Sequence, residues 1–188
     1  MTGGRFILVG GGARSGKTAF ALGRARALGA RRAFIATAQA FDDEMRERID
    51  AHRRERGEDF VTIEEPFALA AALAGLDDID VVVIDCLTIW LTNLLLRDDP
   101  PARILAQVDE LAEAACRRAF HAIVVTNEVG LGVVPATPLG RSFRDLAGLA
   151  HQRLARRADE IDLAILGTVL RIKPMPIRAC DEGASDDR

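Results

Sequence analysis

The chain has 188 residues, of which 49% are hydrophobic and 28% are charged, and its formal net charge is −3. This length and balance fit one folded domain with a hydrophobic core and exclude a disordered chain. The basic residues are scattered among acidic ones, so we expect no nucleic acid as a partner.

The first predicted elements are a short buried strand, Phe6–Val9, and a helix over Lys17–Leu28. The segment that joins them matches the P-loop pattern G-x-x-x-x-G-K-[ST] in full. Its residues are Gly11, Gly12, Ala13, Arg14, Ser15, Gly16, Lys17 and Thr18. Glycines let backbone N–H groups surround phosphate oxygens, and the helix N-terminus adds partial positive charge. We therefore predict a nucleoside triphosphate site, with Lys17 at the β/γ-phosphates and Thr18 at Mg²⁺.

A second strand is predicted over Ala33–Thr37 and a second helix over Asp42–Arg56. Met45, Ile49 and His52 are spaced i, i+4 and i+7, which predicts that the imidazole lies on the inward face of this helix. Such a histidine has three interpretations: a core residue, a general base or a nucleophile toward phosphorus.

The arginines at the end of this helix, Arg53 and Arg56 among them, have two interpretations. They could hold phosphate oxygens, or they could form a solvated basic face. The residue types alone leave both open.

A third major strand is predicted over Val81–Asp85, after a weaker strand at Phe60–Ile63 and a helix over Pro66–Leu76. Asp85 closes its strand, where P-loop enzymes place an acid that coordinates Mg²⁺. Asp is equally suited to cap the helix predicted over Thr88–Leu96. Both interpretations remain open.

The remaining pattern continues the alternation of strands and helices. Further elements are predicted over Ala102–Phe120 (helix), Ala122–Thr126 (strand), Arg141–Asp159 (helix), Leu163–Leu166 (strand) and Val169–Ile172 (weaker strand). Continuous apolar strands joined by helices predict a three-layer α/β P-loop NTPase fold of the RecA-like type, with a mainly parallel sheet covered on both faces. Residues 1–173 are expected to form a single domain, followed by a loose tail over 174–188.

Other residues are interpreted as structural or as markers of location. His121, His151 and Trp90 are assigned to packing. The three cysteines include no Cys-x-x-Cys pair, and the most apolar later stretch is too short to cross a bilayer. These features favour reduced thiols, no membrane span and a cytoplasmic location.

Several segments together carry a resemblance to a known family. They are the P-loop, Ile35-Ala36-Thr37-Ala38, Asp42-Asp43-Glu44-Met45 with His52, Leu87-Thr88 with Leu91-Thr92-Asn93-Leu94-Leu95, Thr126-Asn127-Glu128-Val129-Gly130 and Arg144-Asp145-Leu146-Ala147-Gly148. In collinear order to about Lys173, the chain resembles the bifunctional adenosylcobinamide kinase/adenosylcobinamide-phosphate guanylyltransferase family of cobalamin biosynthesis.

The resemblance implies two reactions and a set of site residues. ATP or GTP would phosphorylate the aminopropanol hydroxyl of adenosylcobinamide, a corrinoid, and GTP would then donate GMP to that phosphate through a guanylylated histidine. The nucleophile would be His52, because Ala51 occupies the position at which some relatives carry a second histidine. Asp85, Glu64 and the run around Thr37, with Ala36 and Ala38, would contact the guanosine. The resemblance also implies a homotrimer.

Two other functions are compatible with the residues. One is a monofunctional small-molecule P-loop kinase with a structural His52, and the other is a RecA-like ATPase that works as a motor or switch. The net charge and the absence of a basic patch in the sequence argue against the second.

Overall fold

The structure is a computed structural model that describes residues 3–40, 43–117 and 119–174. Its strands are β1 (Phe6–Gly11), β2 (Arg32–Ala36), β3 (Val61–Glu64), β4 (Val81–Asp85), β5 (His121–Asn127), β6 (Glu160–Ile165) and β7 (Thr168–Lys173). Its helices are α1 (Lys17–Leu28), α2 (Asp43–Arg56), α3 (Leu69–Ala74), α4 (Leu87–Leu96), α5 (Pro101–Cys116) and α6 (Pro138–Arg157).

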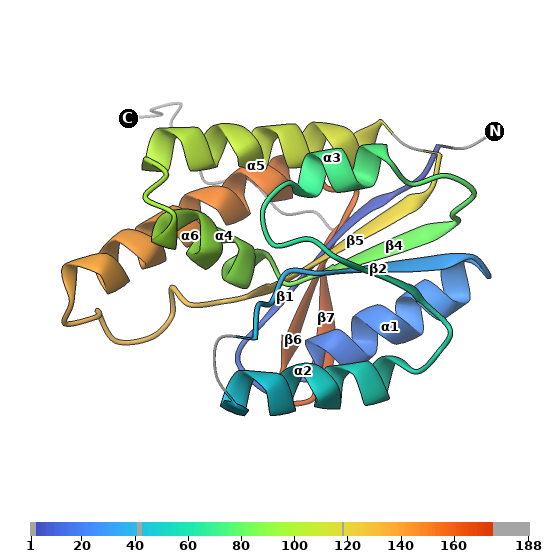
Figure 1. The fold of residues 1–188 in the computed structure, drawn as a ribbon, viewed down its shortest axis with the longest axis horizontal. Coiled ribbons are helices and arrows are strands. Elements are labelled where there is room, and N and C mark those ends of the chain that lie inside the picture. Colours follow the sequence, from blue (N-terminus) through green and yellow to red (C-terminus); the bar gives the residue numbers. More distant parts are fainter. Residues whose placement is uncertain (1–2, 41–42, 118, 175–188) are drawn as a thin grey trace, which may run out of the picture.

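The strands form one seven-stranded sheet in the order β3-β2-β4-β5-β1-β6-β7 (Figure 1). Neighbouring strands are parallel except β6 and β7, which form an antiparallel hairpin at one edge. Because β1, β4 and β5 run in the same direction, their carboxyl ends meet at one edge of the sheet. Ligands of open parallel sheets bind at this edge.

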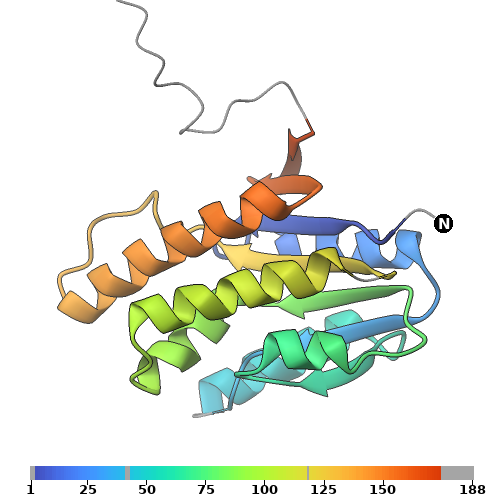
Figure 2. The same cartoon turned by 90° about the horizontal axis from the view of Figure 1, so that it is seen from above.

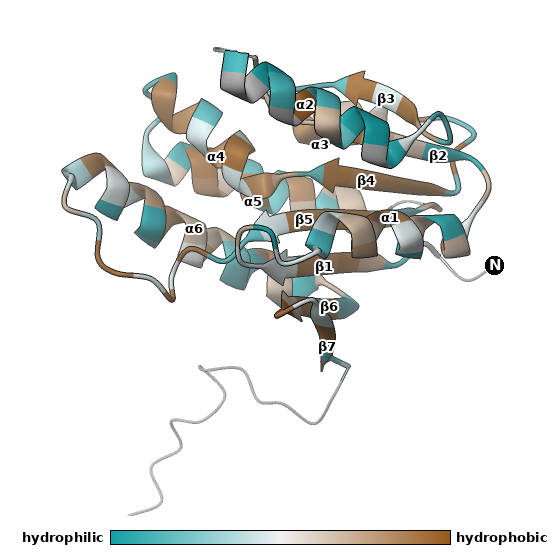
Figure 3. Ribbon diagram, turned by 90° about the horizontal axis from the view of Figure 1, so that it is seen from below, coloured by the Kyte–Doolittle hydropathy of each residue, from teal (hydrophilic) through white to brown (hydrophobic). Residues whose placement is uncertain are grey.

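Helices cover both faces of the sheet, as the alternating pattern predicts. α3, α4, α5 and α6 lie over one face, and α1 and α2 lie on the other side (Figures 1 and 2). Each face has its own apolar core, one built around Trp90 and the other around Leu22 of α1. The central strands are apolar, whereas α2 is hydrophilic along its length (Figure 3). The predicted three-layer α/β fold is confirmed.

The strand predictions are confirmed except in β6. Both weaker candidates form strands, at the two edges of the sheet. For β6, the prediction that the strand is buried on both faces from Leu163 to Leu166 is wrong. The strand begins at Glu160 and alternates between buried and partly exposed residues. Its buried positions include Glu160 and Asp162, which a search for apolar runs passes over.

The helix boundaries differ from the predictions where polar side chains cap the backbone. α6 begins at Pro138 rather than Arg141, because the hydroxyl of Thr137 accepts the amide of Gly140 at 3.1 Å. α3 does not begin at Pro66. The carboxylate of Glu65 instead accepts the amides of Phe67 and Ala68, and the helix starts at Leu69.

Two further expectations concern the ends and the membrane. The expected C-terminal tail lies outside the described residues beyond Pro174. Among the helices that the structure describes, none has both the length and the apolar character that crossing a membrane requires.

A group of buried charges holds β6 and β7 together. Arg171 of β7 donates through Nε to Asp162, which is 1% exposed, and its Nη1 lies 3.1 Å from Glu160. Burial acts to raise the pKa of Glu160, but the guanidinium groups of Arg5 and Arg24 hold that pKa below its usual value. The stabilisation from this carboxylate is therefore present above the pKa of an unfolded Glu and is lost as the pH falls through the lowered pKa.

Replacing Arg171 with methionine is expected to destabilise the fold. The change leaves Asp162 buried without its charged partner, and the expected loss is about 2 kcal/mol, below the value for a fully buried pair because Arg171 is 37% exposed. Urea unfolding measures the change. Arg117→Met, which removes a well-exposed pair with Glu113, is the control and should shift stability by less than about 0.5 kcal/mol. Equal stability of the two variants would contradict the prediction.

Candidate active site

The P-loop leaves β1 at Gly11 and enters α1 at Lys17. Arg14 and Gly16 have φ values of 55° and 88°, so the loop turns through left-handed backbone conformations. Such a conformation strains a residue with a Cβ, which explains the glycine at position 16. A methyl group at Gly11 would lie 2.6 Å from both Ala164 O and Ser15 Oγ, so no larger residue fits there.

Polar groups inside the loop are arranged to receive an anion. Lys17 is only 8% exposed, and its ammonium donates to the carbonyl of Gly12 at 3.0 Å. The hydroxyl oxygen of Ser15 is buried and makes no hydrogen bond among the described residues. A buried polar atom without a partner needs an explanation, and a bound phosphate supplies one. The loop and the start of α1 thus form a phosphate site.

The structure brings Thr18 and Asp85 together and decides between the two interpretations of Asp85. The Thr18 hydroxyl donates to Asp85 Oδ2 at 2.8 Å. α4 begins at Leu87 with Cys86 at its N-cap position, and no side chain caps it. Asp85 is therefore not the helix cap. Its carboxylate lies at the end of β4, beside the phosphate loop.

The Thr18–Asp85 pair fits a magnesium ion. A hydroxyl and a carboxylate oxygen are hard ligands of the kind that Mg²⁺ prefers, with phosphate oxygens and water completing its shell. The described residues contain no cluster of three or more His, Cys, Asp or Glu side chains that could enclose a metal. An ion at this position would therefore depend on the nucleotide for part of its coordination.

A cavity of about 510 Å³ opens beyond the carboxyl ends of β2 and β3, under α2. It brings together five of the predicted site residues, namely Ala36, Ala38, Arg53, Arg56 and Glu64. Arg53 forms ion pairs with Glu64 and, at 3.5 Å, with Asp50. The cavity therefore combines both signs of charge with small apolar residues, a composition suited to a nucleoside.

Arg56 occupies the inner end of this cavity. It is 5% exposed, and its guanidinium carbon lies 4.3 Å from the centre of the Phe34 ring. Burial and the neighbouring Arg53 lower its pKa, and its Nε makes no hydrogen bond among the described residues. Arg56 is thus a buried cation with unused donor capacity at a cavity wall, which favours the anion-binding interpretation over a solvated face.

The prediction for Thr37 needs correction. Its side chain is fully buried, and its hydroxyl donates to Cys86 O at 2.9 Å and accepts Cys86 N–H at 2.8 Å. Both partners belong to Cys86, the residue after β4, so this hydroxyl joins the ends of β2 and β4 and does not line the cavity. Only the flanking alanines, Ala36 and Ala38, do so.

The predicted orientation of His52 is also wrong. His52 is exposed, whereas Arg46, Ile49, Asp50 and Arg53 are the α2 residues that line the cavity. These four positions follow the i, i+3, i+4, i+7 spacing of one helix face, and His52 is offset from Arg53 by about 100°. The spacing of Met45, Ile49 and His52 predicted the wrong inward face because α2 contains too few apolar residues for their burial to set its orientation.

The polar residues at the end of β5 belong to a segment that carries the family resemblance, but the sequence analysis gave them no role in the site. Asn127 closes this strand, and its amide nitrogen donates to the Thr88 hydroxyl at 2.9 Å. Glu128 follows, and its backbone N–H donates to Gly11 O at 3.0 Å. The sequence signal that could have indicated a role for them is an apolar strand followed by two polar residues, just as β4 ends in Asp85.

Fold and site together define a P-loop NTPase of the RecA-like type: β5 separates the P-loop strand from the strand of the acid that meets Thr18. The fold resembles a solved structure described as an ATPase domain (TM-score 0.50, 14% identity, 85% of this chain and 68% of that chain). It also resembles the Pyrococcus horikoshii OT3 protein PH0250 (TM-score 0.54, 9% identity, 91% and 87%). At these identities the likeness shows the fold alone.

The family follows from sequence similarity. Residues 7–172 match the CobU family, described as cobinamide kinase / cobinamide phosphate guanyltransferase. The chain is 43% identical over 171 residues to the bifunctional adenosylcobalamin biosynthesis protein CobP of Pseudomonas aeruginosa, covering 90% of this chain and 98% of the relative. It is 39% identical over 183 residues to CobU of Escherichia coli, covering 89% and 99%. The chain belongs to the cobinamide kinase / cobinamide phosphate guanyltransferase family.

Proposed function

We propose that this enzyme phosphorylates the aminopropanol hydroxyl of adenosylcobinamide with ATP or GTP, and then transfers GMP from GTP to the product through His52. Membership in a family described by both activities supports the two-step reaction. The observation that carries it in the structure is the pairing of Thr18 with Asp85 beside a P-loop that holds a buried Lys17.

In the first step the chain positions the triphosphate and neutralises its charge. The loop amides and Lys17 hold the β- and γ-phosphates, so the γ-phosphorus is presented at the carboxyl edge of the sheet. Thr18 and Asp85 would hold Mg²⁺, which when bound neutralises charge on the phosphate oxygens. Oriented donors in a site of this kind account for much of the catalysis of phosphoryl transfer.

In the second step the cavity of about 510 Å³ holds the guanosine. The guanine edge presents N–H donors, and Glu64 offers carboxylate oxygens that accept them. Glu64 lines this cavity and Asp85 does not, so Glu64 is the better candidate of the two acids for base recognition. Arg53 and Arg56 would contact phosphate or ribose oxygens.

The histidine divides the guanylyl transfer into two displacements. A neutral ring nitrogen of His52 bonds to the α-phosphorus as the bond to the bridging oxygen breaks and pyrophosphate leaves. The phosphate of adenosylcobinamide phosphate then bonds to that phosphorus, and the nitrogen–phosphorus bond breaks. A rotation of α2 would turn His52 toward the cavity. Arg56 is the only buried residue of α2 among those whose side chains are described, so little packing opposes such a rotation.

The assembly and location belong to the same proposal. Large apolar side chains are exposed on the segment between β5 and α6 and on the first turn of α6, namely Leu131, Val133, Val134 and Leu139. Exposed apolar residues gathered on one segment are typical of a protein contact, which supports the homotrimer. Cys86 and Cys116 are free thiols, which supports a cytoplasmic location.

Product analysis tests the two-step reaction. The purified protein is incubated with adenosylcobinamide, GTP and Mg²⁺. The corrinoid products are then separated by chromatography and identified by mass spectrometry. We expect adenosylcobinamide phosphate first, then its GDP derivative with release of pyrophosphate. Phosphate product alone would identify a monofunctional kinase. Nucleotide hydrolysis with no modified corrinoid would identify an ATPase of another kind.

A further inference from the structure

A second cavity, of about 240 Å³, lies between α6 and the sheet on the opposite face from α1. Most of its wall is apolar and includes Leu8, Ile161 and Leu163. Its polar lining residues are Thr126, Glu128, His151, Gln152 and Asp162, and the first three are neighbours in the structure. A cavity with apolar walls and a few convergent polar groups is the usual form of a small-molecule site.

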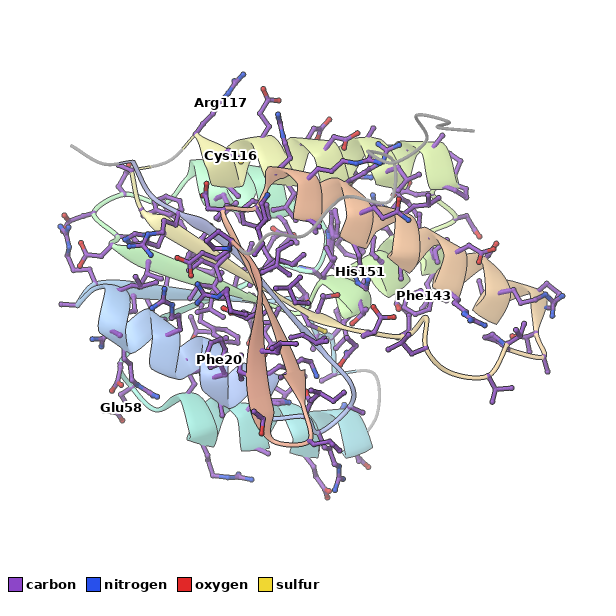
Figure 4. The ribbon with its side chains drawn as sticks, turned by 180° about the vertical axis from the view of Figure 1, so that it is seen from behind. Phe20, Glu58, Cys116, Arg117, Phe143 and His151 are labelled. Carbon is purple, nitrogen blue, oxygen red and sulfur yellow. The ribbon has the colours of Figure 1, made fainter. Side chains whose placement is uncertain are left out.

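The three polar residues lie side by side and come from two parts of the chain, the end of β5 and α6. His151 of α6 lies between that helix and the sheet (Figure 4), and its Nε2 is 2.7 Å from the Thr126 hydroxyl. Its Nδ1 faces Glu128 Oε2 at 3.7 Å. Burial lowers the pKa of His151, against the opposing effect of Glu128. The imidazole therefore stands beside one oxygen of the Glu128 carboxylate without a hydrogen bond to it.

The backbone places Glu128 directly beside the P-loop. Its N–H donates to Gly11 O, and the Lys17 ammonium donates to the next carbonyl, Gly12 O. The other carboxylate oxygen accepts the amide of Gly130, whose carbonyl is held by Arg144 of α6 at 2.7 Å. Glu128 is therefore an oriented, half-buried carboxylate, and it is joined to the loop that carries the lysine of the β/γ-phosphates.

We propose that Glu128 is the general base of the phosphoryl-transfer step, and that the cavity beside it receives the short aliphatic arm that carries the acceptor hydroxyl. This inference rests on the proposed kinase activity. Of the two strands that flank β1, β5 is followed by this acid and β6 by Leu166. Asp85, on the next strand, is committed to Thr18.

The chemistry balances with these groups. The acceptor oxygen bonds to the γ-phosphorus as the bond from that phosphorus to the β,γ-bridging oxygen breaks, and the nucleoside diphosphate leaves with that electron pair. The hydroxyl proton passes to the Glu128 carboxylate and then to water. The amide of Gly130 holds the carboxylate, and the hydrogen-bonded pair of His151 and Thr126 forms the polar wall beside it. The apolar walls suit the methyl and methylene groups of a secondary alcohol arm.

The first test separates the two reactions with Glu128→Gln. The amide keeps the shape of the side chain and can still accept from Gly130 N, but it cannot take a proton. The kcat/KM for phosphorylating adenosylcobinamide should fall by about 10²–10⁴-fold. Guanylyl transfer, measured separately with GTP and synthetic adenosylcobinamide phosphate, should stay within about threefold of wild type. Glu110→Gln, an exposed acid on α5, is the matched control for both reactions.

A second variant tests the cavity. A Cβ added at Gly10 would lie 3.8 Å from Leu163 Cδ1 and 3.9 Å from Thr126 Cγ2, so alanine fits there without a clash and narrows the space. Gly10→Ala should raise the KM for adenosylcobinamide severalfold and leave the KM for ATP unchanged. Gly148→Ala, on α6 with no neighbour within 4 Å of the new Cβ, should change neither.

The outcomes distinguish this inference from the proposed function. Full kinase activity in Glu128→Gln overturns the assignment of the base, and equal loss of both reactions shows a structural role and overturns it too. An unchanged KM in Gly10→Ala overturns the placement of the arm. A wild-type protein that forms no phosphorylated corrinoid overturns the proposed kinase activity, and this inference with it.

Discussion

Replacing His52 with alanine is expected to abolish covalent labelling of the protein by GTP that carries radioactive phosphorus at the α position. The variant lacks the nitrogen that bonds to the α-phosphorus, so guanylyl transfer should fall by roughly 10³–10⁶-fold, the range for loss of a covalent nucleophile. His52 is exposed, so its removal leaves the core intact. Phosphorylation of adenosylcobinamide should therefore continue at the wild-type rate.

The matched control for this prediction is Arg54→Ala, which changes an exposed residue on the same helix. It should keep both the label and the activity. Labelled protein is detected after denaturation and gel electrophoresis. Label that survives in His52→Ala would assign the nucleophile to another residue and remove His52 from the mechanism.

Replacing Lys17 with methionine is expected to weaken both reactions, because both need the same triphosphate. The ammonium is nearly buried beside Gly12 O, where methionine keeps most of the side-chain volume but no charge. The rate of each step should fall by about 10²–10³-fold, as expected when one oriented charge is removed from a phosphoryl-transfer site. Calorimetric titration with a non-hydrolysable GTP analogue should show weaker binding.

Lys173→Met is the control for this second prediction. Lys173 bonds to backbone carbonyls at the end of α6, including Ala155 O at 3.3 Å, and it has no place in the site. Its removal should lower stability and leave nucleotide affinity unchanged. A Lys17→Met variant that retains both activities would contradict the P-loop assignment.

Much of the fold could be predicted because the signals are local. β1, β4 and β5 each contain an uninterrupted apolar run of four residues, and strands buried on both faces require such runs. The signal failed at β6, whose buried Glu160 and Asp162 are stabilised by arginines from elsewhere in the chain. Charged residues are rarely buried unless they are paired, and the local sequence does not show the pairing partner.

The candidate site shows the same division. The residues that line the larger cavity come from β2, α2, β3 and the segments that follow β2 and β3, and several of them were expected from the resemblance. The orientation of α2 was not predictable, because a helix with so few apolar residues is oriented by its polar neighbours. Thr37 was misassigned for a related reason: its two bonds to Cys86 appear only when β2 pairs with β4.

The sequence by itself determined the phosphate loop, since the strand, the glycines, Lys17 and the helix start are consecutive and their chemistry is local. Only the tertiary structure decided which side chains from other parts of the chain lie near the loop. His151 meets Thr126 across 25 residues because α6 packs against the sheet, and Asp85 meets Thr18 across 67 because the order of strands in the sheet sets which carboxyl ends are neighbours. That order depends on packing between distant segments, which no local pattern encodes.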